Sequence, residues 1–134
     1  HSSFVDIGSG TGILSIIAHK EGASRVLAND IDPEARRVAR ENFAKNNLDV
    51  SKVTDLAISD IEGQFDIVCA NILDHVLLQL SSDLIRLKKS DGYLVLSGIL
   101  IEHEQDFIRD FFLEHQLSIH KRVARNEWVA FLVS

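Results

Sequence analysis

Short apolar runs alternate with longer amphipathic segments along the 134 residues of the chain. The apolar runs have the length and character of strands buried in a sheet. The predicted strands are residues 4–7, 25–29, 49–54, 65–70 and 93–97. In the intervening segments apolar residues recur three and four positions apart, as on one face of a helix. The predicted helices are residues 13–21, 33–46, 74–89 and 102–115. Strands that alternate with helices predict an α/β protein with a parallel sheet.

The last two apolar runs, residues 117–124 and 128–133, depart from this pattern. Only the polar stretch "RNE" separates them, which is too short for a crossover helix and predicts an antiparallel hairpin. The predicted fold class is a doubly wound, Rossmann-like α/β sheet of seven strands that ends in this hairpin. Ligands of such sheets bind at the carboxyl ends of the strands, near the point where the winding reverses.

Local signals predict several element boundaries. Asp32 followed by Pro33 is typical of a helix start, since an acidic N-cap precedes a proline in the first turn. Gly22 is expected to end the first helix. The stretch "SDG", residues 90–92, predicts a turn before the fifth strand.

The stretch "FVDIGSGTGIL", residues 4–14, predicts a loop that approaches a ligand closely. Its glycines are Gly8, Gly10 and Gly12. The spacing differs from the G-x-G-x-x-G of dinucleotide-binding enzymes, because Ile13 stands where the third glycine should be. No Gly-Lys pair follows, which opposes a phosphate loop. Asp6 would repel a pyrophosphate and favours a cationic amino acid group, although a plain strand-to-helix turn also needs glycines.

Acidic residues after the second and third strands extend this candidate site. Asp30 stands where a carboxylate can accept hydrogen bonds from both ribose hydroxyls of an adenosine. Asp32 is interpreted instead as the helix cap. Asp55 and Leu56 offer adenine an acceptor and an apolar face, and Asp60 is a competing acceptor. A ligand with an adenosine and a cationic amino acid group is indicated.

The stretch "ANIL", residues 70–73, closes the fourth strand with a polar residue. Asn71 follows an apolar run at the edge where cofactor and substrate would meet, so it is the candidate catalytic residue. The alternative is an asparagine that only satisfies backbone groups. Cys69 is interpreted as core, and residues 102–104 as a solvated helix start and not a metal site, since consecutive helical residues point in different directions.

Composition narrows the function classes. Apolar residues make up 46% of the chain and charged residues 25%, and no apolar run approaches the roughly 18 residues that a membrane span needs. The net charge of −6 opposes a domain that coats nucleic acid. A single cysteine cannot form an intramolecular disulfide, and no secretory leader is recognisable. We expect a cytoplasmic protein without direct contact to nucleic acid or membrane.

Several stretches together resemble the bacterial PrmA family, the methyltransferases of ribosomal protein L11. They are "DIGSGTGIL", "NDIDP", "ANIL", "LSGIL" and "EWVAF". The resemblance implies the class I S-adenosylmethionine-dependent methyltransferase fold, with S-adenosylmethionine as cofactor. The cofactor contacts that it implies are Asp6, Gly8, Ser9, Gly10, Thr11, Gly12, Asp30, Ile31, Asp55, Leu56 and Asn71. In this loop Ser9 and Thr11 are mild departures from the usual family residues.

The resemblance also implies the reaction, the transfer of methyl groups to lysine and N-terminal amines of a ribosomal protein, with Asn71 beside the methyl group. Family members have a cofactor-covering segment and a substrate-recognition domain before the first strand. Neither stands before Phe4 here, so we expect residues 1–134 to be one catalytic domain and a fragment of a longer protein. Alternatives are a methyltransferase for another protein lysine, a non-catalytic cofactor-binding module, and a nicotinamide-dependent oxidoreductase, which the glycine spacing opposes.

Overall fold

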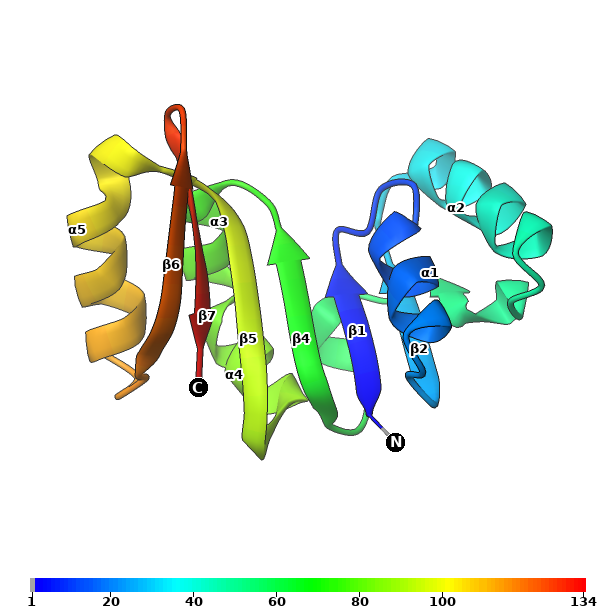
Figure 1. Ribbon diagram of the computed structural model, residues 1–134, viewed down its shortest axis with the longest axis horizontal. Helices are drawn as coiled ribbons and strands as arrows, with labels where there is room; N and C mark the ends of the chain where they lie inside the picture. Colours follow the sequence, from blue (N-terminus) through cyan, green and yellow to red (C-terminus); the bar gives the residue numbers. More distant parts are fainter. Residues whose placement is uncertain (1) are drawn as a thin grey trace.

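The seven predicted strands form one mixed sheet (Figure 1) in a computed structural model that describes residues 2–134. The strands are β1 (Ser3–Ile7), β2 (Arg25–Asn29), β3 (Val53–Thr54), β4 (Phe65–Asn71), β5 (Lys88–Leu100), β6 (Ile119–Arg125) and β7 (Trp128–Val133). Their order across the sheet is β3-β2-β1-β4-β5-β7-β6. The winding therefore reverses between β1 and β4, which places the expected ligand site at the carboxyl ends of these two strands.

Pairing directions confirm both the parallel sheet and the terminal hairpin. Strands β3, β2, β1, β4 and β5 pair in parallel, whereas β7 is antiparallel to both β5 and β6. The hairpin closes where Arg125 pairs with Trp128. Asn126 lies in this turn with a φ of 55°, a left-handed conformation that asparagine tolerates better than most residues.

Helices cover the sheet on both faces (Figure 1). They are α1 (Ile13–Lys20), α2 (Pro33–Lys45), α3 (Asp74–Gln79), α4 (Ser81–Leu87) and α5 (Glu104–Phe107), which continues as a π-helix (Ile108–Leu113). Short 3-10 turns occur at Val50–Lys52, Ile58–Asp60 and Ile101–His103. Among residues 2–134, every helix falls short of the length and apolar character needed to cross a bilayer.

Two hydrophobic clusters stabilise the two faces. The cluster under α1 and α2 includes Ile16, Ala39 and Phe43 from the helices, packed with sheet residues such as Phe4 and Cys69. The larger cluster lies under α3, α4 and α5, and its largest fully buried side chains include Phe65, Phe107, Phe111, Phe112 and Phe131. Successive strand residues point to opposite faces, so β1, β4 and β5 each contribute to both clusters.

Local boundary signals are confirmed at α1 and α2. The Asp32 carboxylate accepts a hydrogen bond from the Glu34 amide at 3.0 Å, and Pro33 is the first helical residue. The chain leaves α1 through Gly22, whose φ is 102°. Both helices are therefore bounded by interactions that the sequence predicts from adjacent residues.

The single helix predicted at residues 74–89 is wrong, because the chain forms two helices there. Leu80 separates α3 from α4 and leaves the regular helical path, with a φ of −95° and a ψ of 5°. The break lets each short helix bury its own leucine face, Leu77 from α3 and both Leu84 and Leu87 from α4. Packing on the sheet therefore overrides the continuous helical period.

The turn predicted at residues 90–92 is also wrong, because β5 already begins at Lys88. Lys88 pairs with Phe65 and Tyr93 pairs with Ile67, so five steps along β5 match two along β4. A Cβ on Gly92 would lie 2.8 Å from the carbonyl oxygen of Asp66. The Ser-Asp-Gly signal thus marks an irregularity in the ladder, where only glycine permits so close an approach of two backbones.

Candidate active site

The glycine loop after β1 closes onto the end of β2. The amides of Gly8 and Ser9 donate to the carbonyl of Asn29 at 2.8 and 2.9 Å. The amide of Gly12 donates back to the carbonyl of Ser9 at 3.0 Å. The φ angles are 74° at Gly8, 56° at Gly10 and 78° at Gly12, all in the left-handed region. The loop therefore needs its three alternating glycines to make this turn into α1.

The carboxylate of Asp30 lies directly against this loop. Its Oδ2 accepts a hydrogen bond from the Gly10 amide at 2.9 Å, and its Oδ1 accepts one from the Asp32 amide at 3.0 Å. A carboxylate oxygen has two lone pairs, so both oxygens retain acceptor capacity for hydroxyl groups of a ligand. The structure thus brings together Asp30 and the glycine loop, which the sequence analysis had assigned to one site.

Asp6, in β1 just before the loop, carries a nearly enclosed carboxyl group. The residue is 2% exposed, and among residues 2–134 its Oδ1 has no hydrogen-bond partner. Burial, with the nearby negative charge of Asp30, raises the pKa of Asp6 from 3.8 to about 7. The buried hydroxyl of Ser9 likewise has no partner among these residues. A cationic, hydrogen-bonding ligand would supply what both groups need.

Asn29 is a residue of this site that the sequence analysis missed. Its buried side chain donates from Nδ2 to the carbonyl of Leu56 at 2.8 Å. Its own carbonyl receives the two loop amides, so one residue ties together the glycine loop, β2 and the segment after β3. The available signal was a polar residue that closes an apolar strand, the same signal that singled out Asn71.

The other residues expected on the cofactor side are exposed around Asn29. Ile31 is 80% exposed and Leu56 is 44% exposed, and the neighbouring Asp55 is exposed as well. Asp60, the competing acceptor, is exposed in the next 3-10 turn. Leu56, whose carbonyl accepts the bond from Asn29, and its neighbour Asp55 therefore lie next to the anchor of the glycine loop.

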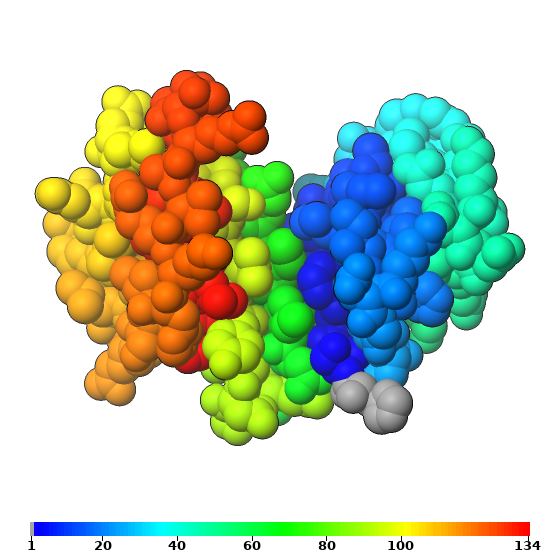
Figure 2. Space-filling view, viewed as in Figure 1, coloured from blue at the N-terminus to red at the C-terminus, as the bar shows by residue number. Residues whose placement is uncertain are grey.

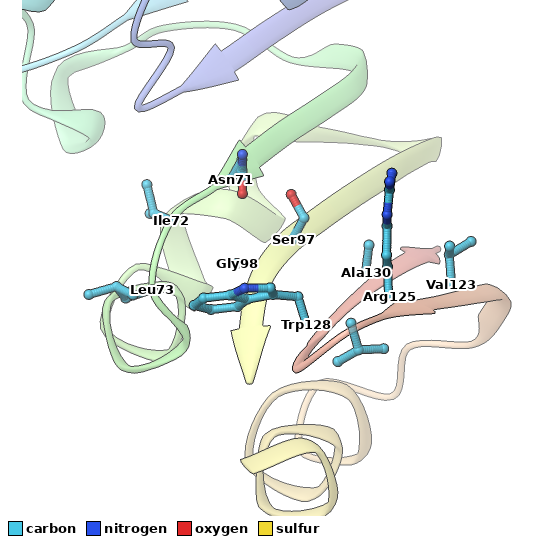
Figure 3. A pocket seen from close by; sticks show the side chains of 10 residues that line it. Asn71, Ile72, Leu73, Ser97, Gly98, Val123, Arg125, Trp128 and Ala130 are labelled. Atoms are coloured by element: carbon cyan, nitrogen blue, oxygen red, sulfur yellow. The ribbon is translucent and has the colours of Figure 1, made fainter. Parts of the chain in front are cut away.

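Asn71, the last residue of β4, opens onto a cavity of about 560 Å³. It pairs with Ser97 of β5, and the two side chains point toward each other (Figure 3). The indole of Trp128 lies along Gly98 and extends toward Leu73, as Figure 3 also shows. Arg125 is the charged residue of the lining, which contains no carboxylate. This cavity can hold an uncharged amine next to two polar side chains.

Ile72 joins the glycine loop to the cavity. A Cβ on Gly8 would lie 2.7 Å from Cγ2 of Ile72, and a Cβ on Gly98 would lie 2.4 Å from its carbonyl oxygen. The two glycines therefore leave room for Ile72 between the loop and the end of β5. In Figure 2 the molecule is notched at this end of the sheet, between the orange tip of the β6–β7 hairpin and the blue and cyan residues of α1 and α2.

Residues 102–104 stand at the start of α5, and Glu102 and His103 are exposed, as predicted, but two of the three also have partners that the sequence did not reveal. Nδ1 of His103 lies 2.8 Å from Oδ2 of Asp74, and Glu104 accepts two hydrogen bonds from the guanidinium of Arg122. Both partners are remote in sequence. No group of three or more metal-binding side chains occurs among residues 2–134.

Cys69 is a core residue, as predicted. It is 5% exposed, and burial together with the charge of Asp6 raises the pKa of its thiol to about 12. Such a thiol stays protonated at neutral pH, and only the thiolate is a good nucleophile. The site's chemistry therefore rests on its carboxylates, backbone amides and the polar groups around Asn71.

A family model described as Ribosomal protein L11 methyltransferase (PrmA) matches residues 1–134. The ribosomal protein L11 methyltransferase of Thermotoga maritima is 42% identical over 133 residues, which cover 98% of this chain and 50% of that protein. The protein of the same name from Geobacter metallireducens is 42% identical over 128 residues, which cover 96% of this chain and 42% of that protein. The chain thus spans about half the length of the curated relatives it matches.

Solved structures agree with this relationship. The structure of a ribosomal protein L11 methylase from Lactobacillus delbrueckii subsp. bulgaricus superposes with a TM-score of 0.92 at 33% identity, covering 99% of this chain and 69% of that one. A putative RNA methyltransferase from Pyrococcus horikoshii shares the fold, with a TM-score of 0.81 at 23% identity over 99% of this chain and 74% of that one. The sheet, the glycine loop and both comparisons lead to one conclusion: the chain belongs to the ribosomal protein L11 methyltransferase (PrmA) family.

Proposed function

We propose that residues 1–134 are the catalytic domain of an S-adenosylmethionine-dependent protein methyltransferase that acts on lysine and N-terminal amines of ribosomal protein L11. Family membership supports the reaction class and the ribosomal protein substrate. The relatives are about twice as long as this chain, which supports a substrate-recognition domain outside it. A ribosomal protein substrate also favours action in the cytoplasm.

The observation that carries the proposal is the buried carboxyl of Asp6 facing Asp30 beside the glycine loop. Two carboxylates at the end of a parallel sheet disfavour an anionic pyrophosphate and favour a cationic ligand. S-adenosylmethionine fits, because its ammonium group suits Asp6 and the loop carbonyls, and its ribose hydroxyls suit the open lone pairs of Asp30. Asp55, Leu56 and Ile31 would border its adenine.

When bound, the cofactor would supply an electrophilic methyl group on a sulfonium that leaves as a neutral thioether. The protein therefore needs no acid to assist departure. The difficult partner is the amine, because a lysine with a pKa near 10.4 is neutral for only about one part in a thousand at pH 7.4, a cost of roughly 4 kcal/mol. The cavity beside Asn71 has no carboxylate to hold an ammonium, and its apolar walls disfavour the charged form.

Asn71 and Ser97 would then orient the neutral amine by hydrogen bonds, with Asn71 accepting an N–H and Ser97 assisting from the next strand. Trp128 would pack against the aliphatic part of the substrate side chain. Correct alignment of amine and methyl group supplies much of the remaining acceleration.

Methyl incorporation tests the proposal. The full gene product is incubated with radiolabelled S-adenosylmethionine and ribosomal proteins from cells that lack the gene, and modified residues are located by mass spectrometry. We expect label on L11 amines. Label on a different protein's lysine would favour a methyltransferase of other specificity. Cofactor binding without any transfer would favour a non-catalytic binding module, and binding of a nicotinamide dinucleotide would overturn the cofactor assignment.

A further inference from the structure

Asp74 is a buried acid that the proposed reaction does not use. It is the first residue of α3 and is 8% exposed. Its Oδ2 accepts a hydrogen bond from the amide of Leu100 at 3.2 Å and lies 2.8 Å from Nδ1 of His103. One carboxylate oxygen thus binds the last residue of β5 and the 3-10 turn that follows it.

These contacts hold a short segment of chain along the carboxyl end of β5. Asn71 pairs with Ser97 at the start of the segment. Ile72 follows, in backbone contact with Gly98. Asp74 then ends the segment with its bond to the Leu100 amide. The residues between these anchors, Ile72 and Leu73, line the cavity into which Asn71 opens, so the anchors set the shape of its wall.

The charged groups around this contact favour an ion pair. Burial raises the pKa of Asp74, but the hydrogen bonds from His103 and Leu100 outweigh it and hold the pKa below 3.8. The hydrogen bond to Asp74, with the charges of Asp74, Glu102 and Asp106, raises the pKa of His103 above 6.5. Two further titratable neighbours are His75, whose Nδ1 lies 4.0 Å from Oδ1 of Asp74, and Asp110, which lines the same surface hollow as Asp74 and His103. Asp74 and His103 are therefore both charged between pH 3.8 and pH 6.5, and His103 loses its proton as the pH rises above the pKa of its side chain.

We propose that Asp74 and His103 are positioning residues for methyl transfer, which fix residues 71–73 against the end of β5 and so place Asn71 for the reaction. The inference rests on the proposed function for its kinetic readout. It has a second readout that does not, because Trp128 is the only tryptophan of the chain and lines the same cavity as Leu73.

The kinetic test uses Asp74→Asn in the full gene product, with Asp106→Asn as the matched control. Asp106 lies near His103 and lines the same surface hollow, but no hydrogen bond joins it to Asp74 or His103. We expect Asp74→Asn to lower kcat about tenfold to a hundredfold, since misplacement by about 1 Å has effects of this size. The Kd for S-adenosylmethionine should stay unchanged, and Asp106→Asn should retain wild-type kcat. An unchanged kcat in Asp74→Asn would overturn the proposal.

The spectroscopic test follows Trp128 emission and its quenching by iodide in the full gene product, with any tryptophan outside residues 1–134 replaced by phenylalanine. We expect a red shift and stronger quenching in Asp74→Asn, and in the wild type the same change as the pH rises above the pKa of His103. His103→Gln should remove that pH dependence, whereas a change that arises elsewhere in the protein would persist in this variant. Because His103 is exposed, His103→Gln is a milder substitution and keeps the proposal testable even if Asp74→Asn fails to fold.

The two readouts separate the inference from the proposed function. If the wild-type protein transferred no methyl group, the proposed function would be refuted. Trp128 emission would still report whether Asp74 and His103 shape the cavity. Trp128 emission that is identical in wild type, Asp74→Asn and His103→Gln would refute the positioning role, even in an active enzyme.

Discussion

The two halves of the candidate site solve different problems with different chemistry. The cofactor half, around β1 and β2, relies on backbone amides and two acids beside a loop of positive-φ glycines: Asp30 is hydrogen-bonded to the loop, and Asp6 precedes it in β1. The acceptor half, around β4, β5 and β7, offers uncharged polar groups in an apolar cavity. Acid near a cationic cofactor stabilises binding, whereas acid near the amine would stabilise the unreactive ammonium. Negative charge therefore lies where it would favour cofactor binding and is absent from the cavity where it would make the amine unreactive.

The halves also differ in how they are held. Hydrogen bonds to two residues at the end of β2, Asn29 and Asp30, fix the glycine loop. Close backbone contact and one buried acid fix the acceptor wall, through Gly98 and Asp74. Substitutions in the cofactor half should consequently change cofactor affinity, and substitutions in the acceptor half should change turnover.

The largest effect is expected for Gly98→Ala. Its Cβ would lie 2.4 Å from the carbonyl oxygen of Ile72, at a φ of 85°. The backbone of Ile72 cannot move aside as a flexible side chain can. We therefore expect Gly98→Ala to lower the free energy of unfolding by about 2–5 kcal/mol. Gly10→Ala, at a φ of 56° with open space around it, should cost only about 1–2 kcal/mol. Urea denaturation of both variants measures the difference, and equal losses would contradict the close contact.

Asn71→Ala is expected to affect turnover far more than binding. Removal of one orienting hydrogen bond at a reaction centre typically lowers kcat about a hundredfold. Steady-state kinetics with the protein substrate, together with calorimetric titration of the cofactor, measures both quantities. Asn46→Ala, at the end of α2, is the control asparagine. Equal losses in kcat and cofactor affinity would remove Asn71 from the orienting role.

Asp30→Ala should weaken S-adenosylmethionine binding at least about tenfold, since hydrogen bonds to a carboxylate are worth about 1.5–3 kcal/mol each. Asp32→Ala removes a neighbouring acid that caps α2, so it should cost about 1 kcal/mol of stability and little affinity. Isothermal titration of the two variants tests the assignment. Similar affinities in both would show that Asp30 does not hold the ribose.

The smallest effect on affinity is a pH dependence that Asp6 imposes on the cofactor half. Its folded pKa of about 7 lies above the unfolded value of 3.8. The free chain should therefore lose stability as the pH rises from 3.8 to about 7, because the folded state binds more protons there. A cationic ligand favours ionised Asp6, so its affinity should rise up to about tenfold between pH 6 and 8, with proton release below pH 7. Asp6→Asn should flatten this profile, and a profile that keeps its slope in Asp6→Asn belongs to another group.

Sequence predicts the cofactor half well because its signals are local. Pro33 and its cap define α2, the alternating glycines define the loop, and Asp30 follows the next strand at the distance expected for this fold. The predicted bounds of β2 agree with the structure to the residue. Each of these signals depends on neighbours along the chain or on a recurring spacing.

The acceptor half was less predictable because distant segments define it. Asp74 and His103 are 29 positions apart, and neither belongs to a recognisable spacing. The irregular start of β5 comes from the approach of Gly92 to Asp66, which a local turn signal cannot reveal. The position of Asn71 at the end of an apolar strand was enough to single it out. The cavity wall beside it depends on how Ile72 packs between Gly8 and Gly98, which the sequence does not reveal.

The strand order has a consequence for how the protein is made. β7 pairs between β5 and β6, although it is synthesised after both. A nascent chain that has reached the end of β5 holds every residue of the cofactor half, yet Trp128 and the hairpin wall of the acceptor cavity are still missing. A domain generally folds as a unit and not strand by strand. Because β7 lies inside the sheet, between β5 and β6, the sheet and both halves of the site can form only after the last strand has been synthesised.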